Sequence, residues 1–440
     1  MTTRTTEVDY LVIGGGAMGT AFVDTVLTGD KKATFAIVDR KDCLAGHWND
    51  SYDFVKLHQP ALFYGVNSRK LGNGTTDLSS KSEILEYYAK ILEDFHQSGR
   101  VEFLGEHEYL GENRAKSLTD ENASVEFIVK RRVVNATFMG VEVPSTHAPK
   151  FDVSDDVPFV PLNSLTDEIG KWKNYCVLGC GKTGMDAIQY LLNRGVPASE
   201  IHWVISNDIW CFERAEIQVG KVMDAILDHC HSIIEAKTPP EIFTTLEMRG
   251  GILRVNQDAT PTKWKCPTVS LEEINLMKQI TNTIRNGRVK SISAVGIEFA
   301  DETLIMPEDT LFVNCTADGL AKRAAVPLFE KGKVNLQPIF FCQQVFSAAT
   351  IGALELCNTT DEKRNRITPV PHPEVEADWP HVLSNSVDNA LKLQLFIPIW
   401  LRRSRLFYLS HEPLHKYVIY AIQAFLVSGR LRRAANRLSA

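Results

Sequence analysis

The fold is decided by a glycine-rich stretch, Tyr10-Leu11-Val12-Ile13-Gly14-Gly15-Gly16-Ala17-Met18-Gly19. The same pattern returns later in the chain as Tyr175-Cys176-Val177-Leu178-Gly179-Cys180-Gly181-Lys182-Thr183-Gly184. Both copies place G-x-G-x-x-G between a short apolar run and a helical pattern, which predicts a buried strand, a tight turn and a helix. The first glycine permits the turn, the second lets backbone approach a pyrophosphate, and the third lets helix pack on strand.

Two such turns in matched contexts predict two dinucleotide sites, because a pyrophosphate binds the free N–H groups at a helix N-terminus. We therefore expect an α/β chain with two Rossmann-like domains, each doubly wound with three ββα layers. Two dinucleotides in one chain indicate that electrons pass between them. The expected cofactor-binding residues of the two turns are Gly14, Gly16, Gly19, Gly179, Gly181, Lys182, Thr183 and Gly184.

Acidic residues follow the second strand of each unit, where a carboxylate accepts hydrogen bonds from a ribose. Asp39 lies 20 residues after Gly19, and Asp208 lies 24 residues after Gly184. Asp208 favours a free ribose hydroxyl and repels a 2′-phosphate, whereas Lys182 or Arg214 suits that phosphate. The choice between NADH and NADPH stays open at this point.

Charge and cysteine content exclude several classes of protein. The 440 residues include 48 Lys and Arg against 54 Asp and Glu, a net charge of −6, which gives no case for nucleic-acid binding. The polar start Met1-Thr2-Thr3-Arg4 lacks an apolar signal core, so we expect a cytoplasmic protein. Nine cysteines without a C-x-x-C pair predict reduced, buried thiols, with neither a disulfide relay nor a metal site.

Other segments give simpler patterns. Residues 81–97 predict a helix with Ser82 as its N-cap, and residues 101–138 predict short strands in a meander. Residues 220–247 are helical in pattern, whereas residues 327–350 are apolar and β-leaning.

The C-terminal segment, residues 393–440, holds eight Lys or Arg and one Glu and predicts basic helices. Its apolar run Tyr417 to Val427 is too short to span a bilayer, which needs about 20 residues. We expect this extension to pack on the domain or on a second subunit. The alternative is a basic apolar helix lying on an anionic membrane surface.

Segments after the first glycine turn resemble a known family. They are Ala45-Gly46-His47-Trp48, Leu57-His58-Gln59-Pro60 and Tyr64-Gly65-Val66-Asn67-Ser68-Arg69-Lys70. With the two glycine turns, they are similar to the two-dinucleotide flavoproteins typified by flavin-containing monooxygenases, whose relatives include N-hydroxylating and Baeyer–Villiger enzymes. The likeness spans about residues 8 to 320. It implies FAD at the first turn and NADPH or NADH at the second.

The resemblance also implies roles for single residues. Asn67 matches an amide that touches flavin and nicotinamide, and it is the leading catalytic candidate. His47 and His58 flank the implied flavin face, where a histidine can move protons near neutral pH. Besides Asp39, the resemblance implies three further residues that contact the cofactor. Trp48 would lie along the flavin, Gln59 would lie at the flavin edge, and Asp318 belongs to the varied closing motif Asp309 to Gly319. The stretch Val157 to Leu165 lacks the Gly and His of a family signature, which disfavours a Baeyer–Villiger assignment.

The implied domains are residues 1–165 with 297–392 for FAD, residues 166–296 for NAD(P)H, and the extension 393–440. The implied activity is that of a monooxygenase that consumes NAD(P)H and oxygenates a small organic substrate with O2 through a flavin hydroperoxide. One alternative is a flavin-dependent oxidoreductase that inserts no oxygen. Another is a dinucleotide-binding scaffold or redox sensor that acts through its basic helices.

Overall fold

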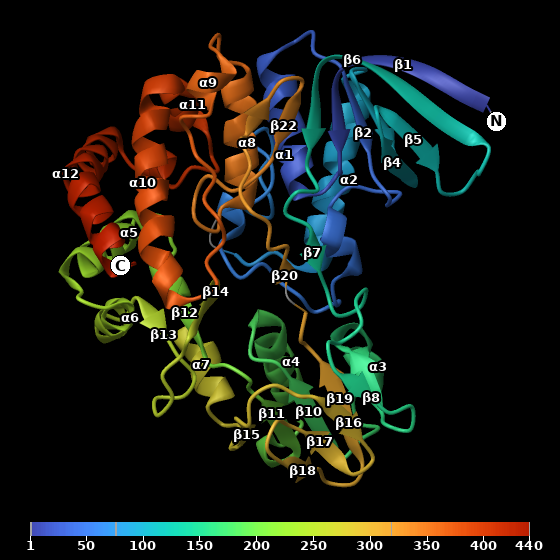
Figure 1. The fold of residues 1–440 in the computed structure, drawn as a ribbon, viewed down its shortest axis with the longest axis vertical. Helices are drawn as coiled ribbons and strands as arrows, with labels where there is room; N and C mark the ends of the chain where they lie inside the picture. Colours follow the sequence, from blue (N-terminus) through green and yellow to red (C-terminus); the bar gives the residue numbers. More distant parts are fainter. Residues whose placement is uncertain (1, 75–76, 318, 440) are drawn as a thin grey trace.

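The computed structural model describes residues 2–74, 77–317 and 319–439. Three regions are visible in Figure 1: an N-terminal sheet, a second sheet at the opposite end, and a group of helices beside both. The termini lie on opposite sides of the molecule in this view.

The first sheet is built around β1, whose apolar second half ends at the first glycine turn. Its main strands occur in the order β21 (Phe329–Glu330), β22 (Lys333–Asn335), β6 (Ala123–Asn135), β1 (Thr2–Ile13), β2 (Phe35–Val38) and β3 (Val101–Leu104). All neighbours from β22 to β3 are parallel. A meander of β4 (His107–Gly111) and β5 (Arg114–Ser117) joins β6 antiparallel, as the sequence predicts for residues 101–138. The parallel strands with their connecting helices belong to a mixed α/β fold.

Two helices that pack closely against one another line this sheet, α1 (Ala17–Gly29) and α8 (Gln344–Glu355). A Cβ added at Gly352 would lie 3.2 Å from the Phe22 carbonyl oxygen, so a small residue is needed there. The β-leaning expectation for residues 327–350 is wrong over its second half. Residues Val345 to Leu354 of α8 are all buried, so no polar face marks the helical period.

Helix α2 (Lys81–Gln97) matches its predicted range, but its N-cap is Ser80 rather than Ser82. The Ser80 side chain accepts from the Glu83 N–H, and Glu83 reaches back to the Ser80 N–H. This reciprocal pair satisfies two backbone donors that the first turn of a helix leaves free.

The second sheet is wholly parallel, in the order β15 (Asn282–Ile284), β11 (Ile201–Val204), β10 (Asn174–Leu178), β19 (Thr310–Asn314) and β9 (Phe159–Pro161). Helices α3 (Leu165–Glu168), α4 (Lys182–Asn193) and α7 (Leu271–Met277) belong to this region. A smaller sheet of β18 (Thr303–Ile305), β17 (Gly296–Glu298), β16 (Ser291–Ser293) and β8 (Asp152–Val153) lies beside it. Strands β7 (Val141–Glu142) and β20 (Gly319–Leu320) pair where the chain crosses between regions.

The strands of this sheet exceed the expected domain bounds 166–296. Strands β9 and β19 lie outside those bounds, yet both hydrogen-bond within the second sheet. Residues 209–269 lie within the bounds but form a separate sheet of β12 (Ile209–Glu213), β13 (Ile252–Leu253) and β14 (Lys263–Val269). The aromatic residues of β12 and β14 share a core with Trp379 of the C-terminal helices. Residues 209–269 therefore pack with those helices.

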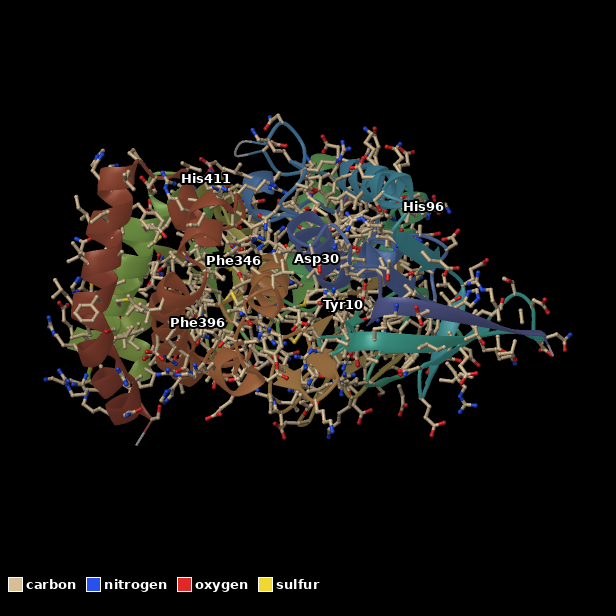
Figure 2. All side chains as sticks on the ribbon, turned by 90° about the horizontal axis from the view of Figure 1, so that it is seen from above. Tyr10, Asp30, His96, Phe346, Phe396 and His411 are labelled. Atoms are coloured by element: carbon tan, nitrogen blue, oxygen red, sulfur yellow. A yellow bond between two sulfur atoms is a disulfide. The ribbon has the colours of Figure 1, made fainter. Side chains whose placement is uncertain are left out.

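That helical region comprises α5 (Val222–Glu235), α6 (Pro239–Met248), α9 (Asp361–Arg364), α10 (Trp379–Phe396), α11 (Pro398–Arg403) and α12 (Leu414–Leu438). Helix α12 packs on α10 and α5 along the outer edge of the molecule, outside Phe396 in Figure 2. Its outward apolar side chains are exposed, namely Leu414, Val418, Ile419, Ile422, Phe425 and Leu426. Among the described residues, no helix has the length and apolarity to cross a bilayer. The expected dimer or membrane contact stays a prediction.

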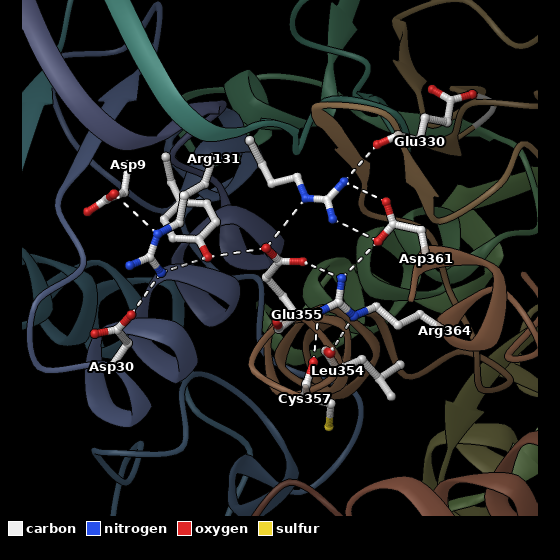
Figure 3. A network of polar contacts seen from close by, with 11 residues as sticks. Asp9, Asp30, Arg131, Glu330, Leu354, Glu355, Cys357, Asp361 and Arg364 are labelled. Carbon is white, nitrogen blue, oxygen red and sulfur yellow. Dashed lines mark hydrogen bonds and ion pairs between the residues drawn. The ribbon is translucent and has the colours of Figure 1, made fainter. Parts of the chain in front are cut away.

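A buried ionic network closes the ends of α1 and α8 that lie away from the glycine turn (Figure 3). The Arg364 guanidinium donates to the carbonyl oxygens of Leu354, Glu355 and Cys357, at 2.9, 2.8 and 2.8 Å. It also pairs with Asp361, which accepts from Arg132 at 2.7 Å. Arg364 therefore caps the C-terminus of α8, where free carbonyl groups favour a cation.

Candidate functional site

The first glycine turn has the geometry of a pyrophosphate site. Gly14 adopts φ +103°, and a Cβ added at Gly19 would lie 2.1 Å from the Gly14 carbonyl oxygen. Gly16, the N-cap of α1, makes no side-chain cap, and the first turn of α1 holds no acidic residue. Backbone donors at this helix start are thus left for an anionic ligand.

Asp39 stands at the end of β2, as expected for a ribose ligand. Its Oδ2 accepts from the Gly15 N–H at 2.6 Å, and its Oδ1 accepts from the Lys41 N–H at 2.8 Å. Burial raises the pKa of this carboxyl, while the two N–H donors oppose that shift. Each carboxylate oxygen has two acceptor positions, so a ribose hydroxyl has room to donate to Asp39.

The second glycine turn repeats this geometry at the start of α4. Gly179 adopts φ +115°, and a Cβ at Gly184 would lie 2.0 Å from the Gly179 carbonyl oxygen. A Cβ at Gly181 would meet no heavy atom within 4 Å, so the backbone there is open to a phosphate. Lys182 and Thr183 occupy the uncapped first turn, and Lys182 pairs with Asp186 within the helix.

Asp208 and Arg214 differ in setting from what the sequence indicates. Asp208 accepts two hydrogen bonds from Arg285, at 3.0 and 3.1 Å, so its charge is compensated rather than free to repel a phosphate. Arg285 follows β15 directly, a strand that the sequence pattern does not reveal. Arg214 donates to the His58 carbonyl at 3.1 Å and to Glu273 at 2.6 Å.

The segment from Tyr52 to Gln59 joins the two dinucleotide regions. The Tyr52 hydroxyl donates to Asp186 of α4 at 2.6 Å. His58 accepts from the Thr268 N–H through Nδ1 at 3.2 Å, while its carbonyl accepts from Arg214. We call residues 52–59 the bridging segment, since it contacts α4 of the second region through Tyr52 and the sheet of β12 and β14 through His58.

Both predicted histidines are neutral at physiological pH. Burial lowers the pKa of His58 to about 3, with further lowering from Lys182, Arg214 and His372. Burial lowers the pKa of His47 to about 4. Since Nδ1 of His58 accepts a hydrogen bond, its proton resides on Nε2. His58 is therefore a hydrogen-bond donor rather than a cationic acid.

Burial of neutral histidines predicts how stability depends on pH. Burial also lowers the pKa of His229 to about 3. Unfolded histidines protonate near pH 6.5. Stability is therefore fully present above that pH and is lost as pH falls toward 4, by about 1 kcal/mol per pH unit for each of His47, His58 and His229. Urea unfolding across this range measures the slope. His229→Gln is expected to reduce it by about 1 kcal/mol per pH unit. The exposed His147→Gln control should leave it unchanged, and an unchanged slope in His229→Gln would contradict the account.

Trp48 and Gln59 both lie near the first site. The Trp48 indole N–H donates to the Tyr64 hydroxyl at 2.7 Å, and its ring is buried. Gln59 accepts from Gln343 at 3.2 Å, and Gln343 also donates to the Tyr408 hydroxyl. Gln59 thus contacts the N-terminal end of α8.

Gln343 and Gln344 are site residues that the sequence pattern missed. The Gln343 Oε1 and both side-chain polar atoms of Gln344 are buried without a partner. Buried amides of this kind normally find partners, so they suit a polar ligand at this place. The sequence does contain one signal for these residues, because Gln343 and Gln344 form a polar pair between two apolar runs.

Asn67 lies apart from this group. Its Oδ1 accepts from Ser404 at 2.9 Å, and its neighbour Ser68 donates to Asp24 in the middle of α1. Arg405 holds the same loop by donating to the Val66 carbonyl at 2.8 Å. The Asn67 Nδ2 is buried without a partner. Its role beside a flavin stays a prediction, and Asp318 lies outside the described residues.

The cysteines correct one expectation. Cys266 and Cys342 form a disulfide, and His372 places a ring nitrogen within 4.8 Å of both sulfur atoms. No local pattern predicts this pairing, because the two cysteines are 76 residues apart. The other seven cysteines are free thiols, as predicted.

Comparison with known proteins places the chain in a family. The uncharacterized protein Rv2000 of Mycobacterium tuberculosis is 35% identical over 405 residues, covering 88% of this chain and 74% of that protein. The probable indole-3-pyruvate monooxygenase YUCCA3 of Arabidopsis thaliana is 26% identical over 231 residues, covering 48% of this chain and 51% of that protein. The chain belongs to the flavin-containing monooxygenase-like flavoprotein family. No family model matches the sequence.

Solved structures agree with this family at the level of the fold. Cyclohexanone monooxygenase with bound cyclohexanone, in its rotated conformation, aligns with a TM-score of 0.51 and 15% identity, covering 97% of this chain and 98% of that chain. The closed form of cyclohexanone monooxygenase aligns with a TM-score of 0.50 and 16% identity, covering 98% and 99%. At these identities the likeness concerns the fold alone.

Proposed function

We propose that this chain is an oxidoreductase of the flavin monooxygenase type. It holds FAD at the first glycine turn, consumes NAD(P)H at the second, and oxygenates a small organic molecule with O2. The observation that carries this proposal is the bridging segment. It follows the first glycine turn in the chain and contacts the second glycine-turn helix, α4, through Tyr52 and Asp186, while His58 accepts from Arg214 after β12.

The first site fits FAD by its own chemistry. Gly14, Gly16 and Gly19 leave backbone donors for the pyrophosphate, and Asp39 accepts from the ribose. The unpartnered Oε1 of Gln343 and the unpartnered amide of Gln344 offer two acceptors and a donor for the polar edge of a flavin. When bound, FAD supplies hydride acceptance and reaction with O2.

The second site fits a nicotinamide dinucleotide. Gly179, Gly181 and Gly184 leave space for its pyrophosphate, and Lys182 adds a cation there. The Arg285–Asp208 pair supports NADPH as well as NADH, because Arg285 can face a 2′-phosphate and Asp208 can accept from a ribose hydroxyl.

The remaining residues of the proposed site are neutral hydrogen-bonding side chains that are held in fixed positions. Neutral His58 donates from Nε2 without releasing its proton near pH 7. Gln59, Gln343 and Tyr408 form a hydrogen-bonded chain beside the start of α8 that fixes the amide positions. Such neutral donors bind a developing negative charge without delivering an acid proton. For Asn67, the buried free Nδ2 supports the same function.

The test follows oxygen from labelled O2 into product. Holoenzyme with NAD(P)H and a panel of small amines, sulfides and ketones is expected to give an organic product that carries the label. Labelled hydrogen peroxide with every compound would instead favour the alternative, an oxidoreductase without oxygen insertion. Partner binding without NAD(P)H turnover would favour the scaffold hypothesis.

Gln343→Met is expected to retain flavin and raise the hydrogen peroxide released per NAD(P)H by about five-fold. One neutral hydrogen bond is worth about 1 kcal/mol, and methionine keeps the volume while removing the amide. Peroxide assays with matched NAD(P)H consumption measure this ratio. Gln394→Met serves as the control, since Gln394 contacts Tyr417 on the remote helices. An unchanged ratio in Gln343→Met would remove Gln343 from the site.

A further inference from the structure

A disulfide and a histidine lie beside the proposed site and take no part in the function described above. Cys266 lies in β14, and Cys342 lies just before α8. Their sulfur atoms and a ring nitrogen of His372 all lie within 4.8 Å of one another. Cys266 is buried, whereas Cys342 and His372 are half-buried.

Each cysteine is a near neighbour of a residue that contacts the bridging segment. Cys266 is two residues before Thr268, whose N–H donates to His58. Cys342 directly precedes Gln343, whose amide donates to Gln59. The disulfide therefore links the two stretches of chain that donate hydrogen bonds to His58 and Gln59.

The remaining cysteines argue against a merely structural crosslink. Five free cysteines are buried, and Cys43 and Cys357 are half-buried, with no second disulfide among the described residues. Chains that rely on disulfides for stability usually pair most of their cysteines. Here Cys266 and Cys342 alone among the described cysteines form a disulfide, and they lie beside the proposed site.

The backbone at both cysteines is unusual. Cys266 has φ +54° and Cys342 has φ +51°, a region that residues other than glycine seldom adopt. Such conformations persist where surrounding structure enforces them, most often at functional positions.

His372 has a ring nitrogen near both sulfur atoms and one nitrogen free to accept a proton. Its Nδ1 lies 3.0 Å from the Pro373 carbonyl oxygen, which only accepts, so Nδ1 carries the proton. The lone pair of Nε2 is thus available. His372 also lines a cavity of about 360 Å³ with Lys322 and Arg323, which gives the cluster a route to solvent.

We propose that Cys266, Cys342 and His372 form a redox-active dithiol–disulfide centre coupled to the two dinucleotide sites. This inference rests on the proposed function for its electron source. Two electrons break the S–S bond, and two protons complete two S–H groups. NAD(P)H with one further proton supplies both, by way of the flavin, and leaves NAD(P)+. His372 relays a proton between the cavity and the sulfur that leaves as a thiolate.

The experiment counts thiols in the folded holoenzyme. Protein is incubated anaerobically with NAD(P)H, alkylated with iodoacetamide after an acid quench and denaturation, and analysed by peptide mass spectrometry. Untreated protein is expected to show seven alkylated cysteines, and treated protein all nine. Re-exposure to O2 should restore the disulfide, with hydrogen peroxide as the product that takes up the two electrons and protons. In Cys342→Ser, NAD(P)H should open no disulfide, whereas Cys230→Ser should behave as wild type apart from its missing thiol.

The outcomes separate this inference from the proposed function. Flavin bleaching without new thiols would overturn the redox centre and leave the function intact. If the flavin does not bleach, the function fails, and with it the electron route. In that case the folded protein is treated with dithiothreitol, which tests whether the Cys266–Cys342 disulfide can be reduced at all. A disulfide that stays intact would overturn the inference that these cysteines are redox-active.

Two further measurements sharpen the result. His372→Gln is expected to slow thiol appearance about ten-fold with flavin bleaching unchanged, because general acid–base catalysis typically contributes at least that factor. Metal analysis tests the other chemistry that two cysteines and a histidine offer. One zinc ion per chain, lost in Cys342→Ser, would show a metal site instead and overturn the proposal.

Discussion

Gly19→Ala is expected to yield a folded but colourless protein that does not bind added FAD. The new Cβ would lie 2.1 Å from the Gly14 carbonyl oxygen and 3.1 Å from the Ala136 Cβ. The carbonyl belongs to the glycine turn itself, so the turn must open to relieve the clash. Opening it moves the N–H groups that would bind the pyrophosphate. Absorption spectra of the purified variant, before and after addition of FAD, measure the loss.

Two variants at the second turn give the matched comparison. Gly184→Ala, with a Cβ 2.0 Å from the Gly179 carbonyl oxygen, should remain yellow but resist reduction by NAD(P)H. Gly181→Ala meets no protein atom within 4 Å, so it should fold as wild type and lose nucleotide affinity alone. A yellow Gly19→Ala protein with normal reduction would show that the first turn does not hold the flavin.

Arg364→Ala is expected to lower the free energy of unfolding by about 3–5 kcal/mol, the usual cost of breaking a buried ion pair. The guanidinium is only 9% exposed, and it serves three carbonyl groups at the end of α8 as well as Asp361. Its removal leaves those carbonyl groups without their donor in the interior, and the Glu355 carboxylate keeps only Arg132 and Tyr10. Urea unfolding at pH 7 measures the change.

An exposed ion pair provides the control for this effect. Arg69 and Asp94 lie on the surface, where such pairs contribute less than about 1 kcal/mol. Arg69→Ala should therefore change stability far less than Arg364→Ala. Equal losses in the two variants would mean that burial of the network in Figure 3 does not determine its contribution.

The sequence predicted the parts of the fold that local patterns encode. Both glycine turns, the strands before them and the helices after them follow from spacing that backbone geometry requires. Helix α2 was predictable in its full range because it has one apolar face. Helix α8 was not, because burial on all sides removes the helical period that distinguishes it from a strand.

The candidate site was predictable only in part, because tertiary contacts assemble most of it. The positions of Asp39 and Gln59 beside the first site follow from the motif and the family resemblance. The Arg285–Asp208 pair depends on neighbouring strands that lie far apart in sequence. The setting of Asn67 depends on Ser404 in the C-terminal extension, and the pairing of Cys266 with Cys342 brings together two separate loops.

Anaerobic reduction of the purified holoenzyme tests the central claim most directly. We expect a yellow protein with one FAD per chain, whose flavin absorbance bleaches when NADH or NADPH is added without O2. A colourless protein that takes up no FAD, and that leaves both reduced nucleotides unchanged, would contradict it.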